Sequence, residues 1–181
     1  MQSVAMAIGV RAPSLYKRFP ARAQLLVAVE HQALGELQSV LSGGPSSSEP
    51  VTRLRTIARG YRRFAHEHPR LYALLFSGAT AHDERALDAR RKAVAPALAA
   101  LGELVGPEAA LAATRVLTAF MHGFVAMENA GEFRLGPGIN DAFQLGLDSI
   151  LGAFAKKRTP SAARRNPKPE RQARGKSHRR A

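Results

Sequence analysis

Apolar residues recur along this chain at intervals of three and four, and almost nowhere in the alternating pattern of a β-strand. In one stretch, Val51, Leu54, Ala58, Tyr61 and Ala65 fall on a single helical stripe. That spacing gives a helix one apolar face, whereas a half-buried strand needs every second residue to be apolar. Valine and isoleucine, which favour strands, are sparse beside alanine and leucine. The sequence therefore predicts an all-α fold.

Glycine, proline and polar runs divide the pattern into eight predicted helices. Gly9 and Gly131 suit the left-handed turn that ends a helix, and Pro13 and Pro107 suit the first position of a new one. The segment SGGPSSSEP is a loop by composition. The predicted helices span about 2–8, 13–19, 21–42, 51–68, 69–76, 83–105, 107–129 and 139–155.

The net charge of +13 is concentrated at one end of the chain. Residues 156–181 hold 11 Lys and Arg and one Glu, whereas the other 155 residues hold 16 basic and 13 acidic groups. With almost nothing to bury, 156–181 is predicted to be a disordered basic tail. The tail either adds sequence-independent affinity for DNA or has no role.

Several classes of function are excluded by what the sequence lacks. There is no cysteine, and there is no HExxH, GxSxG or GxxxxGK motif. His66 and His68 point apart on a helix, so they cannot share a metal ion. We therefore expect neither an enzyme nor a cofactor or metal site. The apolar stretches are too short for a membrane span, and no signal peptide is recognisable, so we expect a cytoplasmic protein without membrane contact.

Residues 3–19 have the layout of a helix-turn-helix, a short helix and a tight glycine turn followed by a second short helix with polar and basic groups. On spacing alone, an ordinary pair of short helices fits as well. In the DNA-binding interpretation the apolar side chains hold the two helices together, with Val10 buried in the turn. The side chains expected to pack the pair are Val4, Ala5, Ile8, Val10, Leu15 and Phe19.

The string VAMAIGVRAPSLYKRFP resembles the second and third helices of the TetR family, whose common form is IAxxAGVSxxxLYxHFP. The pairs Val4–Ala5, Gly9–Val10, Leu15–Tyr16 and Phe19–Pro20 match in register, and ARAQLL resembles the start of the next helix. The resemblance implies a fold with an N-terminal helix-turn-helix in 1–42.

Carried over by position, the resemblance assigns a set of DNA-contacting residues. Arg11 stands where the family has Ser or Thr, which leaves the second helix without its usual side-chain cap. Arg18 stands in place of the family's usual His. The residues implied to meet the major groove are Arg11, Ala12, Pro13 and Ser14, those implied to hold phosphates are Tyr16, Lys17 and Arg22, and Arg18 adds charge.

The family's first helix, which packs across this motif, has no counterpart here. We therefore expect a truncated helix-turn-helix and weak DNA binding if the chain begins at Met1. Two or three apolar side chains left uncovered cost about 1.5–3 kcal/mol each, comparable to a small domain's whole stability.

Residues 50–155 resemble the WHG type of TetR C-terminal domain. TAFMHGFVAMENAGEF matches its signature with Met121 in place of the tryptophan, and HPRLYALLF also matches. The resemblance implies a ligand-binding and dimerisation domain whose last two helices form a homodimer. The predicted interface is Ala112, Ala119, Gly123, Ala126, Phe143, Leu147, Ile150 and Phe154, and the predicted ligand-binding residues are Tyr61, Phe64, Tyr72, Phe76, Phe120, His122, Phe124 and Met127.

The sequence thus predicts a transcriptional regulator that binds double-stranded DNA as a homodimer. It is expected to be a repressor that an unknown small-molecule effector releases from its operator, although activation fits the same residues. The alternative is a truncated regulator that dimerises or binds ligand without reading DNA sequence. Most of the aromatic residues, and His122, could equally be ordinary core.

Overall fold

The computed structural model describes residues 1–42, 48–78, 80 and 83–158. Within these ranges the chain is all-α, as predicted, and contains no strand. The final helix continues through Arg158, so the first three residues of the predicted tail are helical, and the rest of the tail lies outside the described residues. The helices are α1 (Gln2–Ala7), α2 (Ala12–Arg18), α3 (Arg22–Ser42), α4 (Pro50–Glu67), α5 (Pro69–Leu75), α6 (Glu84–Val105), α7 (Pro107–Asn129) and α8 (Ile139–Arg158).

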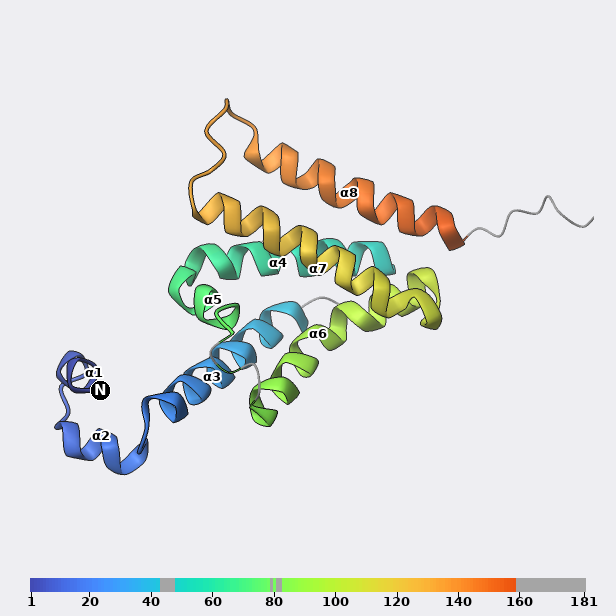
Figure 1. Cartoon of the computed structure of the whole chain (residues 1–181). Helices are drawn as coiled ribbons and strands as arrows, with labels where there is room; N and C mark the ends of the chain where they lie inside the picture. The colour runs from blue at the N-terminus through green and yellow to red at the C-terminus, as the bar shows by residue number, and fades with distance from the viewer. Residues whose placement is uncertain (43–47, 79, 81–82, 159–181) are drawn as a thin grey trace, which may run out of the picture.

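The described helices form two parts joined by α3 (Figure 1). The smaller part, the head, is α1 with α2, and the larger part, the body, is α4 to α8 with the C-terminal part of α3. The helices α1 and α2 pack on each other at the free end of α3. The other end of α3 lies along α6 and α4 inside the body, and α7 packs on α6 and α4. The last helix, α8, packs on α6 and α7. A single helix, α3, thus leads from the head into the body.

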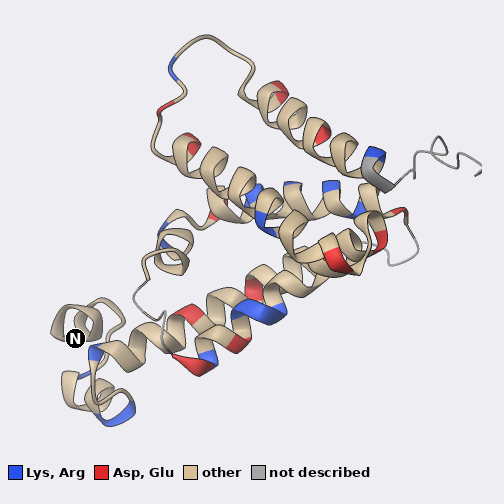
Figure 2. Cartoon of the chain, turned by 45° about the vertical axis from the view of Figure 1, so that its right-hand side comes forward, with Lys and Arg blue, Asp and Glu red and all other residues tan. Residues whose placement is uncertain are grey.

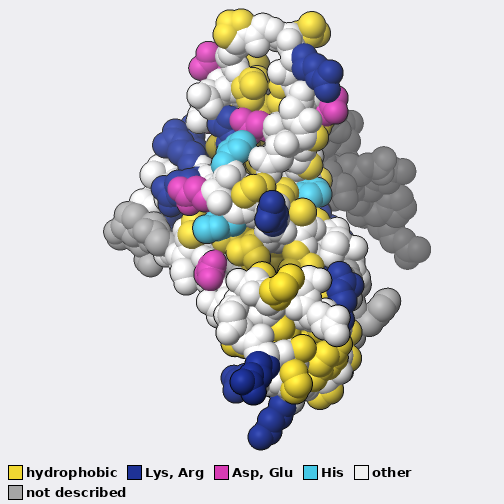
Figure 3. Space-filling view, turned by 90° about the vertical axis from the view of Figure 1, so that its left-hand side faces the viewer, with side chains coloured by type: hydrophobic (Ala, Val, Ile, Leu, Met, Phe, Trp, Pro, Cys, Tyr) yellow, Lys and Arg dark blue, Asp and Glu magenta, His cyan; other side chains and the backbone are white. Residues whose placement is uncertain are grey.

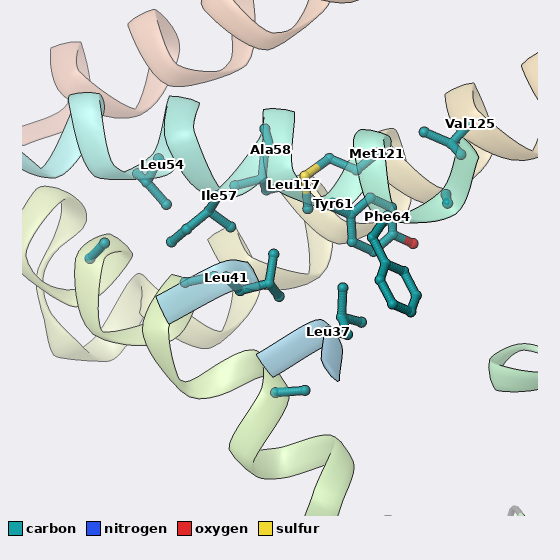
Figure 4. Close-up of a cluster of buried hydrophobic side chains, with 14 of the residues drawn as sticks. Leu37, Leu41, Leu54, Ile57, Ala58, Tyr61, Phe64, Leu117, Met121 and Val125 are labelled. Carbon is teal, nitrogen blue, oxygen red and sulfur yellow. The ribbon is translucent and has the colours of Figure 1, made fainter. Parts of the chain in front are cut away.

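The core of the body forms where α3, α4 and α7 meet (Figure 4). Leu37 from α3 faces Ile57 and Tyr61 from α4, and Leu117 and Met121 come from α7. Burying each of these side chains fully stabilises the fold by about 1.5–3 kcal/mol. The apolar stripe predicted from the spacing on α4 is therefore the face that holds the body together.

A glycine allows α3 and α4 to approach closely. An added Cβ on Gly60 would lie 2.9 Å from Cγ1 of Val40, closer than carbon atoms pack. The close approach places the Leu34 and Leu37 side of α3 against α4 and α6.

Among the described helices, α7 is long and apolar enough, by length and composition alone, to cross a membrane. Its buried residues, which include Leu117, Met121 and Val125, pack into the body, and a core helix passes the same test.

Candidate functional site

The head is a helix-turn-helix at backbone level. Gly9 takes a φ of 71°, in the left-handed region that favours glycine, and the turn is closed by a hydrogen bond of 3.0 Å from the amide of Val10 to the carbonyl of Ala5. Ala5 and Leu15 are 2% and 7% exposed. These two side chains pin α1 to α2.

The burial predicted for Val10 is wrong, whereas Val4 and Ile8 are among the apolar side chains expected to be left uncovered. Val10, expected to be buried in the turn, is 43% exposed, and Ile8 is 60% exposed. Val4 is also largely exposed, and Phe19 is half-buried. The reason is that α1 packs on α2 at the free end of α3, away from the body.

The surface of α2 presents polar and basic groups to solvent. Ser14, Lys17 and Arg18 line a shallow open hollow of about 460 Å³. Figure 3 shows basic and hydrophobic side chains together at this end of the molecule. Of the predicted DNA-contacting residues, Ala12 is half-buried, and those that are exposed are Arg11, Pro13, Ser14, Tyr16, Lys17, Arg18 and Arg22.

The start of α2 has no side-chain cap, as its sequence predicts. Arg11 is the N-cap residue, with an extended backbone (φ −74°, ψ 137°), and makes no side-chain capping hydrogen bond. The cation therefore stays free to contact an external group, and Pro13 lies at the start of the helix, where no amide is needed. Two short helices with an exposed basic face match what a DNA major groove accepts.

The body contains an apolar pocket of about 180 Å³. Of the predicted ligand-binding residues, Tyr61 and Phe76 line it. Sequence reasoning missed the remaining lining residues, which come from α3, α6 and α7: Leu34, Leu37, Leu41, Arg90, Ala93, Val94, Ala97, Thr118 and Met121, with Ile57 and Leu75 from α4 and α5.

Three predicted ligand-binding residues instead form a hydrogen-bonded chain beside the pocket. The hydroxyls of Tyr61 and Tyr72 lie 3.0 Å apart, and the Tyr72 hydroxyl lies 2.7 Å from Nδ1 of His122. Burial raises the pKa of both tyrosines and lowers the pKa of His122, so the chain is uncharged near neutral pH. The ring of Phe76 stacks on His122 with centroids 3.9 Å apart.

The other predicted ligand-binding residues lie away from the pocket. Phe64 is 2% exposed in the core. Phe120 and Phe124 pack against Phe143 of α8, with ring centroids 5.7 and 5.2 Å from it, and Met127 is exposed. These four side chains were chosen by residue type, whereas the pocket depends on which helices approach each other.

A buried ion pair fixes α3 to the body beside this pocket. Glu30 of α3 is fully buried, and its carboxylate accepts hydrogen bonds from the Arg90 guanidinium of α6 and the Thr80 hydroxyl. Arg90 also donates to the carbonyl of Leu75, over 3.3 Å. The same arginine lines the apolar pocket, so the pocket wall and the anchor of the head-bearing helix share one side chain.

The predicted dimer residues divide into two groups. Phe143 and Leu147 are 2% and 0% exposed and pack inside the chain's own core, so they cannot form a contact surface for a second copy. Ile150 and Phe154 are half-buried against that core. Ala126 is half-buried, whereas the residues that lie exposed on α7 are Ala112, Ala119 and Gly123.

An exposed row of apolar and small residues nevertheless remains on each of these two helices. On α7, Val116 is 51% exposed, between Ala112 and Ala119. On α8, Leu145 is 71% exposed, with Ser149 one turn further along. The rows repeat at intervals of three and four residues, which is the spacing of a helix–helix contact.

No group of three or more His, Asp or Glu residues among the described residues could hold a metal ion. His66, which the sequence places beside Glu67 and His68, pairs with Glu128, with its Nε2 2.9 Å from the carboxylate.

Comparison with known proteins matches the body to one family. Residues 54–150 match the family described as tetracyclin repressor-like, C-terminal domain. This match spans more than half of the chain, and the chain therefore belongs to the TetR family of transcriptional regulators.

A curated relative and two solved structures are similar to this chain. An uncharacterized HTH-type transcriptional regulator of Mycobacterium tuberculosis is 28% identical over 134 residues, which are 72% of this chain and 61% of the relative. The chain thus spans less than two thirds of that relative's length.

The two solved structures share the fold. A possible TetR family transcriptional regulator from Streptomyces coelicolor A3(2) has a TM-score of 0.65 at 20% identity, covering 87% of this chain and 89% of that one. A TetR variant from Acinetobacter baumannii AYE, solved in complex with minocycline, has a TM-score of 0.63 at 22% identity, covering 87% and 86%.

Proposed function

We propose that this chain is a cytoplasmic transcriptional repressor that reads DNA as a homodimer and is released by a small apolar effector. The observation that carries the proposal is the path from the head to the pocket. The helix α3 bears the head at one end, and its buried face lines the apolar pocket at the other. Residues 1–42 then act as the reading part with its connecting helix, 50–155 act as the regulatory part, and 156–181 add sequence-independent affinity.

DNA reading is assigned to the exposed face of α2. The first-turn residues Arg11, Ala12, Pro13 and Ser14 meet base edges, because a recognition helix enters the major groove by its N-terminal end. Tyr16, Lys17, Arg18 and Arg22 flank them and hold phosphates, which position the helix on the duplex.

The effector acts by favouring one position of α3. A ligand between α3, α4 and α6 makes its contacts with Leu34 and Leu37, on the helix that carries the head. Binding stabilises whichever arrangement fits the ligand, and the spacing of two heads in a dimer changes with it. The pocket is almost entirely apolar and about the size that holds a benzene-like molecule, so an uncharged apolar effector fits best.

Dimerisation is assigned to the exposed face of α7 and α8. The small residues of α7 let a second copy approach closely, and Val116 and Leu145 supply apolar area. Two copies related by a two-fold axis would present two recognition helices to a near-palindromic site. Leu145→Glu should give a monomer in light scattering, while Leu135→Glu, at a loop residue that is 99% exposed, should stay dimeric. A dimeric Leu145→Glu variant would remove this assignment.

The effector assignment is tested at the pocket mouth. Val94 lines the pocket and is 39% exposed, whereas Leu98, one turn further along α6, is 37% exposed and does not line it. Val94→Trp should weaken toluene binding about tenfold or more by filling the mouth, and Leu98→Trp should leave it unchanged. Equal toluene binding by both variants would show that the pocket is not the site.

The alternative function is a regulator that dimerises and binds ligand without reading DNA sequence. The specific observation that favours it is the exposed apolar surface of α1 and its C-cap, where Met6 is 80% and Ile8 is 60% exposed. With Ala5 and Leu15 as its only buried side chains, the head is held less firmly than the body. Failure of the chain to enrich any DNA sequence would favour this alternative.

A further inference from the structure

A second cleft, separate from the apolar pocket, lies between α4 and the C-terminal helices. It is an open cleft of about 560 Å³, lined by the last two turns of α4, the end of α7 and the start of α8. Figure 2 shows Lys and Arg gathered in the middle of the body, where α4 runs. The basic side chains that α4 places in the cleft are Arg59, Arg62, Arg63 and His66, one helical stripe.

Glu128, the carboxylate that lines the cleft, and Asp148 beside it are already engaged by other residues. Glu128 accepts two hydrogen bonds from Arg62, of 2.8 and 2.5 Å, and also contacts His66. Asp148 is paired with Arg55 at 2.9 Å and accepts a further hydrogen bond from Gln144. Arg62 is also held over the ring of Phe143, at 4.8 Å from its centroid.

The guanidiniums of Arg59 and Arg63 have no carboxylate within salt-bridge distance among the described residues. Arg63 is exposed, and in the part of the chain that the structure describes no carboxylate pairs with it. Arg59 makes one long hydrogen bond, of 3.4 Å, to the neutral side chain of Gln144, and it reaches Asp148 only as a secondary charge behind Arg55. The cleft is thus lined by three arginines and one carboxylate, Glu128, which leaves two positive charges there.

The start of α8 adds hydrogen-bond donors to the same space. Asn140, in the first turn of α8, lines the cleft. The first amides of a helix have no carbonyl partner within the helix, and they favour a negative charge. Asn140 and the arginines thus line one cleft from two helices, and Asp141 already supplies one negative charge in that first turn of α8.

We propose that this cleft binds a small dianionic ligand with a phosphate group, held between the guanidiniums of Arg59 and Arg63. Planar guanidiniums bind phosphate oxygens bidentately, and two of them one turn apart match the charge of one phosphate monoester. The ligand lies against α4, the end of α7 and the start of α8. The proposed dimer face is on α7 and α8, and it shares none of its named residues with the cleft. The assignment stands without the proposed DNA reading, because it uses no residue of the head.

The test is a residue-resolved titration of the full chain with phenyl phosphate at constant ionic strength. Amide signals must be followed individually by NMR, because the basic residues of 156–181 also attract phosphate. Saturable shifts are expected at Arg59, Arg63, Asn140 and Gln144. The double variant Arg59→Gln with Arg63→Gln should bind about tenfold or more weakly at these signals. Arg70→Gln, an exposed arginine on α5 outside the cleft, should bind as the wild type does.

Each other outcome counts against the proposal. Shifts confined to the tail, or equal affinity in the double variant, would show that the cleft is no phosphate site. Benzyl alcohol shifting the same amides as strongly would show that charge is not what the cleft recognises. Since Arg59 and Arg63 are both exposed, the double variant should keep its helical circular dichroism, which separates lost binding from lost fold.

Discussion

The buried pair of Glu30 and Arg90 gives a sharp prediction about what holds α3 in the body. Glu30 is fully buried, and the side chain of Arg90 is 28% exposed. Arg90→Met leaves a buried carboxylate with only the Thr80 hydroxyl, which should cost about 3–5 kcal/mol of unfolding free energy. Glu30→Met leaves a guanidinium that reaches water in part and still bonds the Leu75 carbonyl, so the cost should be smaller, about 2–3 kcal/mol.

The double variant separates charge pairing from packing. Replacing both residues by Met removes the two desolvated charges together, so the double variant should lie within about 1–2 kcal/mol of the wild type. The assay is urea unfolding at neutral pH, followed by far-ultraviolet circular dichroism. Equal m-values would show that each variant unfolds in the same two-state transition as the wild type. Losses in the double variant that equal the sum of the two single losses would refute the reasoning.

Three further predictions concern other parts of the chain. Gly146→Ala should cost about 1–3 kcal/mol of unfolding free energy, because its Cβ would lie 2.5 Å from the Phe120 ring, while Gly35→Ala, with nothing within 4 Å, should be neutral or stabilising; equal unfolding midpoints for the two variants would contradict the packing. Hydrogen bonds from Arg62 lower the pKa of Glu128, so the stability that this pair contributes should be full above the ordinary glutamate pKa of about 4.3 and be lost as the pH falls through the lowered value. Arg62→Gln should therefore flatten the acid limb of the urea midpoint against pH, and an unchanged limb would argue against the pairing. Deleting 156–181 should reduce the slope of log affinity for DNA against log salt concentration and leave the sequence preference intact. An unchanged slope would show that this segment does not contribute to DNA binding.

The helices were predictable from the sequence because their signals are local. The stripe of Leu54, Ala58 and Tyr61, and the breaks at Gly9 and Pro107, fix helix faces and ends through neighbouring residues alone. The predicted start of the last helix at 139 agrees with α8 for the same reason, and its end differs because Lys and Arg are good helix formers that can continue a helix.

The sites were less predictable because they depend on which helices meet. The pocket combines Leu34 of α3 with Ala97 of α6 and Met121 of α7, and no spacing within one helix reports that meeting. Phe143 and Leu147 were predicted to lie in the dimer interface, but they are buried in the chain's own core. An apolar stripe has the same sequence pattern in both cases, so the sequence does not distinguish them. Glu30 gave no signal, since a buried carboxylate is recognised only through its distant partner, Arg90.

In vitro selection of DNA from a random pool by the full chain tests the central claim most directly, with the Tyr16→Ala and Lys17→Ala double variant beside it. The account predicts that the wild type enriches a near-palindrome with two half-sites about one helical turn apart, and that the double variant binds the enriched duplex at least about tenfold more weakly. Equal affinity of the double variant for that duplex, or no enrichment by the wild type, would contradict the assignment of α2 as the DNA-reading helix.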